Sequence, residues 1–358
     1  MLFYLIVILC SFGLMYLAEK TGRSWLYYAG TSVLMGMTAL RFDVGMDFEQ
    51  YFEMEVPELD EITLYPEGDG FNRLGILVKV IYLFADWCGC RQIVFVAAAC
   101  VTFIFTAIAI KRNSKDVIVS WSVFVAFLLS HSFNLIWQVA AASMVYFAIR
   151  FVVDRQPWKF MALVLLAAAI HSSALLALVI YPIYRHAKFE WILIAGISGL
   201  LIKPFIGDLL NAIPHYSAYV QDTYEAYGGG KLMYLYPAVV TGTWGLWYFR
   251  GGRDGGDAGR LEFFRLLSVI VIGIFPMFFL TSDIGSRIGF YFTLFLMFAI
   301  PQALAGCRIL SGCAIAGFVS LFFITIYLYQ QSDRIYDTHV PYKCCLFTDS
   351  SDIRERRK

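Results

Sequence analysis

The segment from Arg41 to Tyr51 gathers side chains that could bind a phosphorylated sugar. It reads Arg-Phe-Asp-Val-Gly-Met-Asp-Phe-Glu-Gln-Tyr, with carboxylates at Asp43 and Asp47. A guanidinium can hold phosphate oxygens through a planar, bidentate fork, while carboxylates accept hydrogen bonds from sugar hydroxyls and a tyrosine ring stacks on a sugar ring. The alternative is structural: Arg41 anchors the chain at a membrane surface and pairs with one of the two aspartates.

A second guanidinium, Arg287, closes the sequence Asp283-Ile-Gly-Ser-Arg287. This sequence predicts a tight external turn between two apolar runs, which would place a second positive charge at the outer surface. The alternative is an Asp–Arg ion pair at the start of a helix.

Asn134 and Gln138 form a polar pair four residues apart, close to His131. A helix through this stretch shows both amides on one face. The two side chains either line an outward-facing cavity or satisfy the backbone groups at a helix end.

Two further ionisable residues are candidates for proton transfer. His171 is followed by two serines inside the long apolar run 159–184, where an ionisable group is costly and therefore a functional candidate. Glu67 stands in an acidic, glycine-rich turn ahead of the shorter run 71–87. The structural alternatives are a helix break whose backbone binds the imidazole, and a helix cap made by the acidic turn.

The composition indicates what must position these residues. The chain is 59% hydrophobic and 15% charged, with a mean hydropathy of +0.67, whereas soluble domains carry about a quarter charged residues. We predict an all-α, polytopic transmembrane helix bundle with about 10–13 membrane segments, formed as a single membrane domain over residues 1–358. Candidate spans lie near residues 2–18, 25–40, 91–110, 117–132, 134–153, 159–184, 189–206, 231–249, 261–280, 286–304 and 309–329, and the run 71–87 is interfacial or re-entrant.

The distribution of basic residues orients this bundle. Between Asp43 and Asp69 there are ten carboxylates and no Lys or Arg, and the stretch 207–230 also lacks a base. We therefore expect the loops at about 41–70 and 207–230 to be external, and the glycine-rich stretch 250–260 to be a flexible cytoplasmic loop. The run 159–184 must then cross an even number of times or re-enter. The basic cluster at 354–358 conflicts with an external C-terminal tail.

No nucleotide, dinucleotide, zinc-protease or serine-hydrolase motif is present. The eight cysteines lack zinc-site spacing, and a disulfide between Cys88 or Cys90 and the pair Cys344–Cys345 would require both places to face an oxidising compartment. We expect no metal, no cofactor and no nucleic-acid partner.

Several motifs in order along the chain resemble those of the EpsG-like, Wzy-type polysaccharide polymerases. They are Arg41–Tyr51, Glu67–Phe71, Asn134–Arg150, Lys159-Phe160, His171-Ser-Ser-Ala-Leu, Ser286–Phe292 and Pro341-Tyr342-Lys343. Two positions depart from the family pattern. Trp137 stands where the family often has Arg, and Phe48 replaces a Tyr. The first removes a positive charge near Gln138 and shifts the expected phosphate contacts to Arg41 and Arg287.

The resemblance implies a multi-pass glycosyltransferase of the bacterial cytoplasmic (inner) membrane. Such a protein polymerises lipid-linked oligosaccharide repeat units on the outer face, transferring a growing glycan from undecaprenyl diphosphate to a new lipid-linked unit without a metal. Flippase and chain-length regulator proteins of the same pathway are its expected partners. A flippase or other transporter of lipid-linked sugars, or an O-antigen ligase, is the alternative.

The residues divide into two expected roles under this reading. Asp47, Glu67 or His171 would supply the general base that the acceptor hydroxyl needs. The substrate-binding residues would be Arg41, Tyr51, Asn134, Gln138 and Arg287, with the two arginines on the diphosphates.

Overall fold

The computed structural model describes residues 1–64, 70–205, 208, 235–250, 256–276, 282–331 and 339–348, and these residues are almost entirely helical. The long helices are α1 (Leu2–Thr21), α2 (Ser24–Ala39), α5 (Gln92–Asn113), α8 (Ile136–Val153), α11 (Phe189–Ile202), α14 (Leu235–Phe249), α15 (Gly256–Ile274) and α18 (Arg308–Gln331). The shorter helices are α3 (Phe48–Phe52), α4 (Ile76–Trp87), α6 (Val117–Phe124), α7 (His131–Asn134), α9 (Pro157–Ala168), α10 (Ile180–His186), α16 (Ser282–Thr293) and α17 (Leu296–Leu304). The 3₁₀ turns are η1 (Leu59–Glu61), η2 (Gly70–Arg73), η4 (Ser172–Val179) and η5 (Lys203–Phe205), and η3 (Val125–Leu129) is a π-helical turn.

Local sequence explains where several of these helices begin and end. α1 ends at Gly22, whose φ of 68° is the left-handed conformation that favours glycine. The Asp116 carboxylate accepts hydrogen bonds from the first amides of α6, and Pro157 begins α9, where a missing N–H has no cost. The C-terminal end of α17 is bound by Arg250, whose guanidinium donates to the carbonyls of Ala303, in the last turn, and Ala305, just after the helix.

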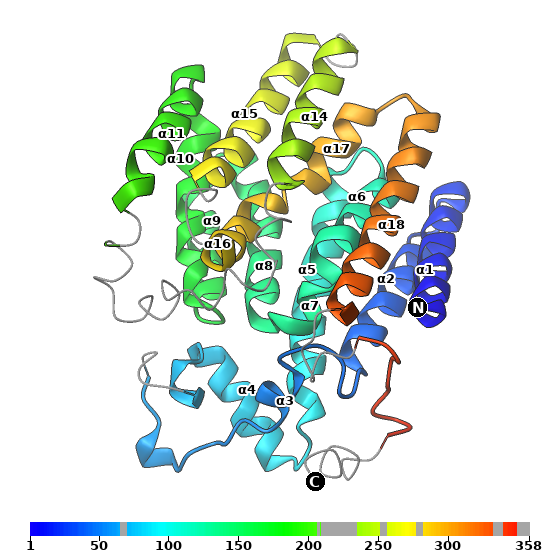
Figure 1. Ribbon diagram of the computed structural model, residues 1–358, viewed down its shortest axis with the longest axis vertical. Coiled ribbons are helices and arrows are strands. Elements are labelled where there is room, and N and C mark those ends of the chain that lie inside the picture. Colours follow the sequence, from blue (N-terminus) through cyan, green and yellow to red (C-terminus); the bar gives the residue numbers. More distant parts are fainter. Residues whose placement is uncertain are drawn as a thin grey trace.

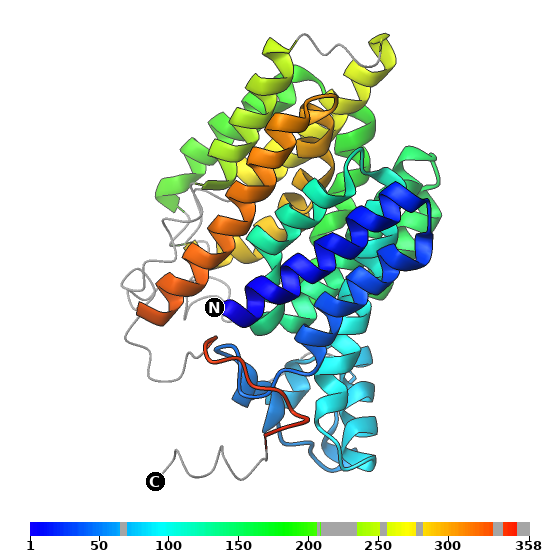
Figure 2. The same cartoon turned by 90° about the vertical axis from the view of Figure 1, so that its right-hand side faces the viewer.

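The bundle has two chemically different ends (Figures 1 and 2). The acidic end, as we call it, carries residues 41–64, α3, α4 and the C-terminal segment 339–348. The predicted basic clusters lie at the opposite end, for example Lys20 and Arg23 at the connection between α1 and α2. The predicted loops at 207–230 and 250–260 lie outside the described residues apart from Asp208, Arg250 and 256–260.

The run 159–184 is not one helix. α9 ends at Ala168, and the chain then folds back as η4 and α10. The fold-back brings the ring of Tyr181 in α10 to 6.0 Å from that of Phe160 in α9, measured between centroids. The turn lies at the acidic end, because the Ala169 carbonyl accepts a 3.0 Å hydrogen bond from Leu77 of α4. His171 therefore lies at a helix turn and not in the middle of a span. This hairpin agrees with the expectation that the run 159–184 begins and ends on the same side of the membrane.

Helix α4 lies within the run 71–87, which the sequence predicted to be interfacial or re-entrant. Its buried side chains include Val78 and Tyr82, whereas Ile76, Val80, Phe84 and Trp87 are exposed. These exposed apolar residues recur at helical spacing and form one stripe. A helix with such a stripe, at one end of a membrane bundle, is suited to the lipid–water boundary.

Within the described part of the chain, five helices are long and apolar enough to cross a membrane, and the segments Val117–Leu129, Pro157–Ala168 and Phe189–Gly199 are shorter and also apolar. One of these five, Arg287–Leu304, is formed by α16 and α17 together with a turn between them, and it corresponds to the run predicted at 286–304. The observed fold is the predicted all-α polytopic helix bundle.

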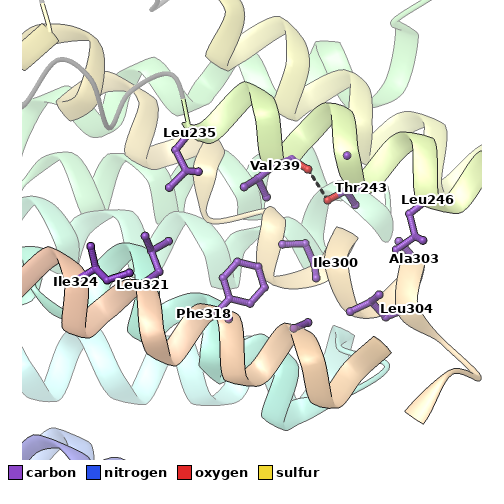
Figure 3. Close-up of a pocket in the computed structure, with 13 residues that line it drawn as sticks. Leu235, Val239, Thr243, Leu246, Ile300, Ala303, Leu304, Phe318, Leu321 and Ile324 are labelled. Atoms are coloured by element: carbon purple, nitrogen blue, oxygen red, sulfur yellow. Dashed lines mark hydrogen bonds between the residues drawn. The ribbon is translucent and has the colours of Figure 1, made fainter. Parts of the chain in front are cut away.

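An apolar groove of about 480 Å³ runs between α14, α17 and α18 (Figure 3). Its one labelled polar side chain, Thr243, donates its hydroxyl proton to the Val239 carbonyl at 2.7 Å, as the dashed line marks. None of the described residues that line it is charged. The groove therefore suits hydrocarbon and cannot bind a diphosphate, so the polar site must be sought elsewhere.

Candidate active site at the acidic end of the bundle

Arg41 fixes the loop that follows α2. Its side chain is 1% exposed, and its guanidinium donates to the main-chain carbonyls of Val44 at 3.0 Å, Thr38 at 3.1 Å and Phe133 at 2.7 Å. The ring of Phe95 also lies against it, at 4.8 Å. Burial lowers the pKa of Arg41 to about 10, which leaves it charged at neutral pH. This buried cation holds three chain segments together.

The loop from Arg41 to Asp47 is also held by a side-chain amide and a glycine. Asn134 Oδ1 accepts a 2.8 Å hydrogen bond from the Met46 amide. Gly45 has a φ of 102°, and a Cβ there would lie 2.7 Å from the Phe133 carbonyl oxygen. Only glycine fits this conformation and this approach. Asn134 therefore positions the loop after α2 through the Met46 amide, a role that differs from both the cavity lining and the helix-end contact weighed from the sequence.

The expected ion pair between Arg41 and a nearby aspartate takes a different form. Asp43 pairs with Lys343 of the C-terminal segment, with 2.8 Å between carboxylate oxygen and Nζ. Asp47 lies immediately before α3 and interacts electrostatically with both Arg41 and Tyr51. The carboxylate of Asp47 is half-buried and stands within the cluster.

Tyr51 lies one helical turn after Asp47 and interacts electrostatically with both arginines. Burial, followed by the charge of Asp47, raises its pKa, while Arg287 and Arg41 oppose that rise. The phenol therefore stays protonated and can donate a hydrogen bond. Its main-chain carbonyl accepts a 2.9 Å bond from the Tyr82 hydroxyl, which positions α3 on α4.

Arg287 of α16 is the residue that links the separate parts of the cluster. It interacts electrostatically with Tyr51, His131 and His171, which come from three different segments of the chain. Gln138 fixes its backbone, because Gln138 Nε2 donates to the Arg287 carbonyl at 2.5 Å. Gln138 is 3% exposed, so in this structure it positions Arg287.

His171 begins a chain of hydrogen-bonded side chains. Its Nδ1 lies 2.6 Å from Ser173 Oγ, which lies 2.8 Å from the Tyr291 hydroxyl. Tyr291 is fully buried and stands four residues after Arg287, on the same face of α16. The two hydroxyls tie the imidazole to the helix that carries Arg287.

The structure brings together Asp47, Tyr51, His171 and Arg287, with Gln138 beside Arg287 and with Arg41 and Asn134 holding the loop behind. Glu67 lies outside the described residues. Sequence reasoning gave no role to Ser173, Tyr291 or Lys343, although the four-residue spacing of Arg287 and Tyr291 was a usable signal. Among the described residues no group of three His, Cys, Asp or Glu side chains is placed to hold a metal ion.

The fold and this cluster define a multi-pass membrane protein with a charged, tyrosine- and histidine-containing site at one end. The model of the EpsG family matches residues 24–344, and the chain therefore belongs to the EpsG family. Membership indicates a polysaccharide-polymerase-like protein of a bacterial membrane and agrees with the motif resemblance. Neither the curated proteins nor the solved structures contain a significant match.

Proposed function

We propose that this chain polymerises lipid-linked oligosaccharide repeat units on the outer face of the bacterial cytoplasmic membrane. A growing glycan would pass from undecaprenyl diphosphate to a hydroxyl of a new lipid-linked unit. The observation that carries the proposal is the meeting of Arg287 with His171 and Tyr51 at the acidic end, in a chain whose family is one of polymerase-like membrane proteins.

Each group in the cluster has a part in this reaction. The leaving group is a lipid diphosphate, so negative charge grows on its oxygen as the glycosidic bond breaks. Arg287 would stabilise that charge without a metal. The acceptor hydroxyl must lose a proton, for which His171 or Asp47 is the base, with Glu67 remaining an alternative. The Tyr51 phenol would donate to a sugar oxygen.

Arg41 receives a revised role in this proposal. Because its guanidinium already donates to three main-chain carbonyls, we assign it to positioning the loop that presents Asp47 and Tyr51, and leave the diphosphate to Arg287. Asn134 acts in the same way through the Met46 amide.

The proposal is tested by the length distribution of surface polysaccharide on a gel, with the gene deleted and then restored. A polymerase predicts single repeat units in the deletion and long chains after restoration. Long chains that are built on the carrier but not moved to the lipid core would instead identify a ligase. Repeat units trapped on the cytoplasmic face would identify a flippase.

A further inference from the structure

The apolar groove between α14, α17 and α18 runs along the bundle. Leu235 and Ile324 lie at one end of the groove, and Leu304 lies at the other (Figure 3). The Leu304 end is next to Arg250, which donates to the neighbouring Ala303 carbonyl at 3.0 Å. Helix α18 runs from there toward the C-terminal segment, so the opposite end of the groove lies toward the acidic end (Figures 1 and 2).

One wall of the groove leads to the candidate active site through η3. The ring of Phe127, in η3, lies 5.3 Å from that of Tyr236 in α14 and 5.8 Å from that of Phe318 in α18, between centroids. Phe318 itself lines the groove. The chain passes from η3 directly into α7, which begins at His131.

A second wall leads to the site through α16. The ring of His131 lies 4.6 Å from that of Phe290, which stands about one helical turn after Arg287. Ile300 of the groove belongs to the same apolar run, Arg287–Leu304. Helical rise along this run places Ile300 roughly 20 Å from Arg287. The groove and the diphosphate-binding arginine are therefore within reach of one lipid molecule.

The groove offers hydrocarbon surface and, among the described residues that line it, no free polar side chain. Thr243 is the polar side chain of this lining, and its hydroxyl donates to the Val239 carbonyl at 2.7 Å. Gly242 and Gly317 leave open space on two walls, since a Cβ added at either would meet no atom within 4 Å. A hydrocarbon chain fits here, whereas a sugar or a phosphate would lose its hydrogen bonds to water.

We infer that this groove binds the polyprenyl chain of the lipid-linked donor. The inference rests on the proposed function, which places the donor diphosphate at Arg287. A headgroup bound there tethers its own hydrocarbon near the groove, so the chain reaches a local concentration that makes it outcompete untethered bilayer lipids. Binding of the donor then depends on the length of its lipid chain as well as on its headgroup.

The test measures binding by the rise in melting temperature of full-length protein in phospholipid nanodiscs. The probes are undecaprenyl diphosphate and citronellyl diphosphate, which carry the same headgroup on a long and a short isoprenoid chain. Gly242→Leu fills the groove and should weaken binding of undecaprenyl diphosphate about tenfold, through the loss of buried hydrocarbon contact. Binding of citronellyl diphosphate should stay as in wild type, because its short chain does not reach the groove.

Gly245→Leu is the matched control for this variant. Gly245 lies on the same helix and also has no atom within 4 Å of an added Cβ, but it does not line the groove. Gly317→Leu and its control Gly312→Leu repeat the comparison on α18. Both controls should bind undecaprenyl diphosphate as wild type does. Equal affinity of Gly242→Leu and Gly245→Leu for this probe would assign the groove to ordinary bilayer lipid and overturn the inference, as would equal weakening of both probes by Gly242→Leu.

The same probes separate the inference from the proposed function. Arg287→Ala should weaken binding of both diphosphates alike, since they share the headgroup. If it bound both as wild type does, the diphosphate would not lie at Arg287 and the inference would be overturned. Wild-type protein that shows the predicted dependence on chain length and still makes no glycan from lipid-linked repeat units would overturn the proposed function and leave the inference standing.

Discussion

Arg41 and Arg287, the two arginines predicted from the sequence, have different surroundings and therefore different roles. Arg41 is buried, and its guanidinium donors are occupied by main-chain carbonyls from three segments. Arg287 is half-buried and interacts with Tyr51, His131 and His171, which places its charge where a substrate could meet it. One residue type thus serves structure at one position and chemistry at another.

Replacement of Arg41 should lower stability. Arg41→Ala leaves the buried carbonyls of Thr38, Val44 and Phe133 without their donor, and hydrogen bonds to charged groups contribute about 1.5–3 kcal/mol each. Arg41→Lys should recover only part of this loss, because an ammonium lacks the planar fork that reaches all three. Melting temperature in detergent measures the effect, with Arg287→Ala as the matched variant. Equal melting temperatures for Arg41→Ala and wild type would contradict the structural role.

The rate of chain extension should depend more on the hydroxyl of residue 173 than on the size of its side chain. Ser173→Ala breaks the chain from His171 to Tyr291, and we expect the rate of chain extension to fall about tenfold, the cost of one buried hydrogen bond of about 1.4 kcal/mol. Ser173→Thr keeps the hydroxyl and should retain most activity. His171→Gln should lose about 10²–10⁴-fold if the imidazole is the base. If Ala and Thr at position 173 gave the same rate, His171 would not depend on this chain of hydroxyls.

At the scale of elements, the site is made by connections between helices. The loop after α2 rests on α7, the hairpin turn after α9 rests on the start of α4, and α16 lies against both α8 and η4. A Cβ at Gly75 would lie 2.4 Å from the carbonyl oxygens of Ala169 and Ile170, so α4 and the hairpin turn touch backbone to backbone. Such contacts satisfy backbone groups that a broken membrane helix leaves open.

Among these connections, Gly45 is a position where both the backbone conformation and the space require glycine. Gly45→Ala adds a methyl group 2.7 Å from the Phe133 carbonyl, at a φ of 102° that side chains rarely adopt. We expect a loss of about 1–3 kcal/mol in stability, with reduced chain extension because the loop carries Asp47 and Tyr51. Gly36→Ala in α2 is the control, since nothing lies within 4 Å of its added methyl. A fully active and stable Gly45→Ala protein would show that the loop is not held as described.

At the scale of the whole molecule, the bundle separates its charges. The acidic loop, α4 and the C-terminal segment share one end, while basic residues such as Lys20 and Arg23 occupy the other (Figures 1 and 2). By the positive-inside rule we propose that the acidic end faces outward. This would place the candidate site where lipid-linked repeat units are polymerised.

The orientation can be measured by labelling single cysteines. In a background without reactive cysteines, Trp87→Cys and Phe347→Cys place thiols at exposed positions of the acidic end, and Arg23→Cys places one at the other end. An impermeant maleimide should label the first two in intact cells, and the third only after the cells are broken. The opposite pattern would reject an outward-facing site.

Hydropathy predicted the helix bundle well, since membrane helices are specified by length and apolar composition alone. The site could be predicted only in part. Arg41 and Arg287 were both visible as motif arginines, but the sequence does not show that the main-chain carbonyls of Thr38, Val44 and Phe133 would accept hydrogen bonds from the first. For His171, the sequence predicted that the run 159–184 crosses an even number of times or re-enters, but it does not show that the turn is stabilised by a contact with the distant residue Leu77.

The central claim is that Arg287 serves catalysis in a polymerase. The most direct measurement incubates purified protein with lipid-linked repeat units extracted from the deletion strain and resolves the products on a gel. Wild-type protein should give a ladder of glycans, and Arg287→Ala should remain folded and lose at least about 10²-fold in rate. A wild-type ladder from Arg287→Ala, or single repeat units alone from folded wild-type protein, would contradict the account.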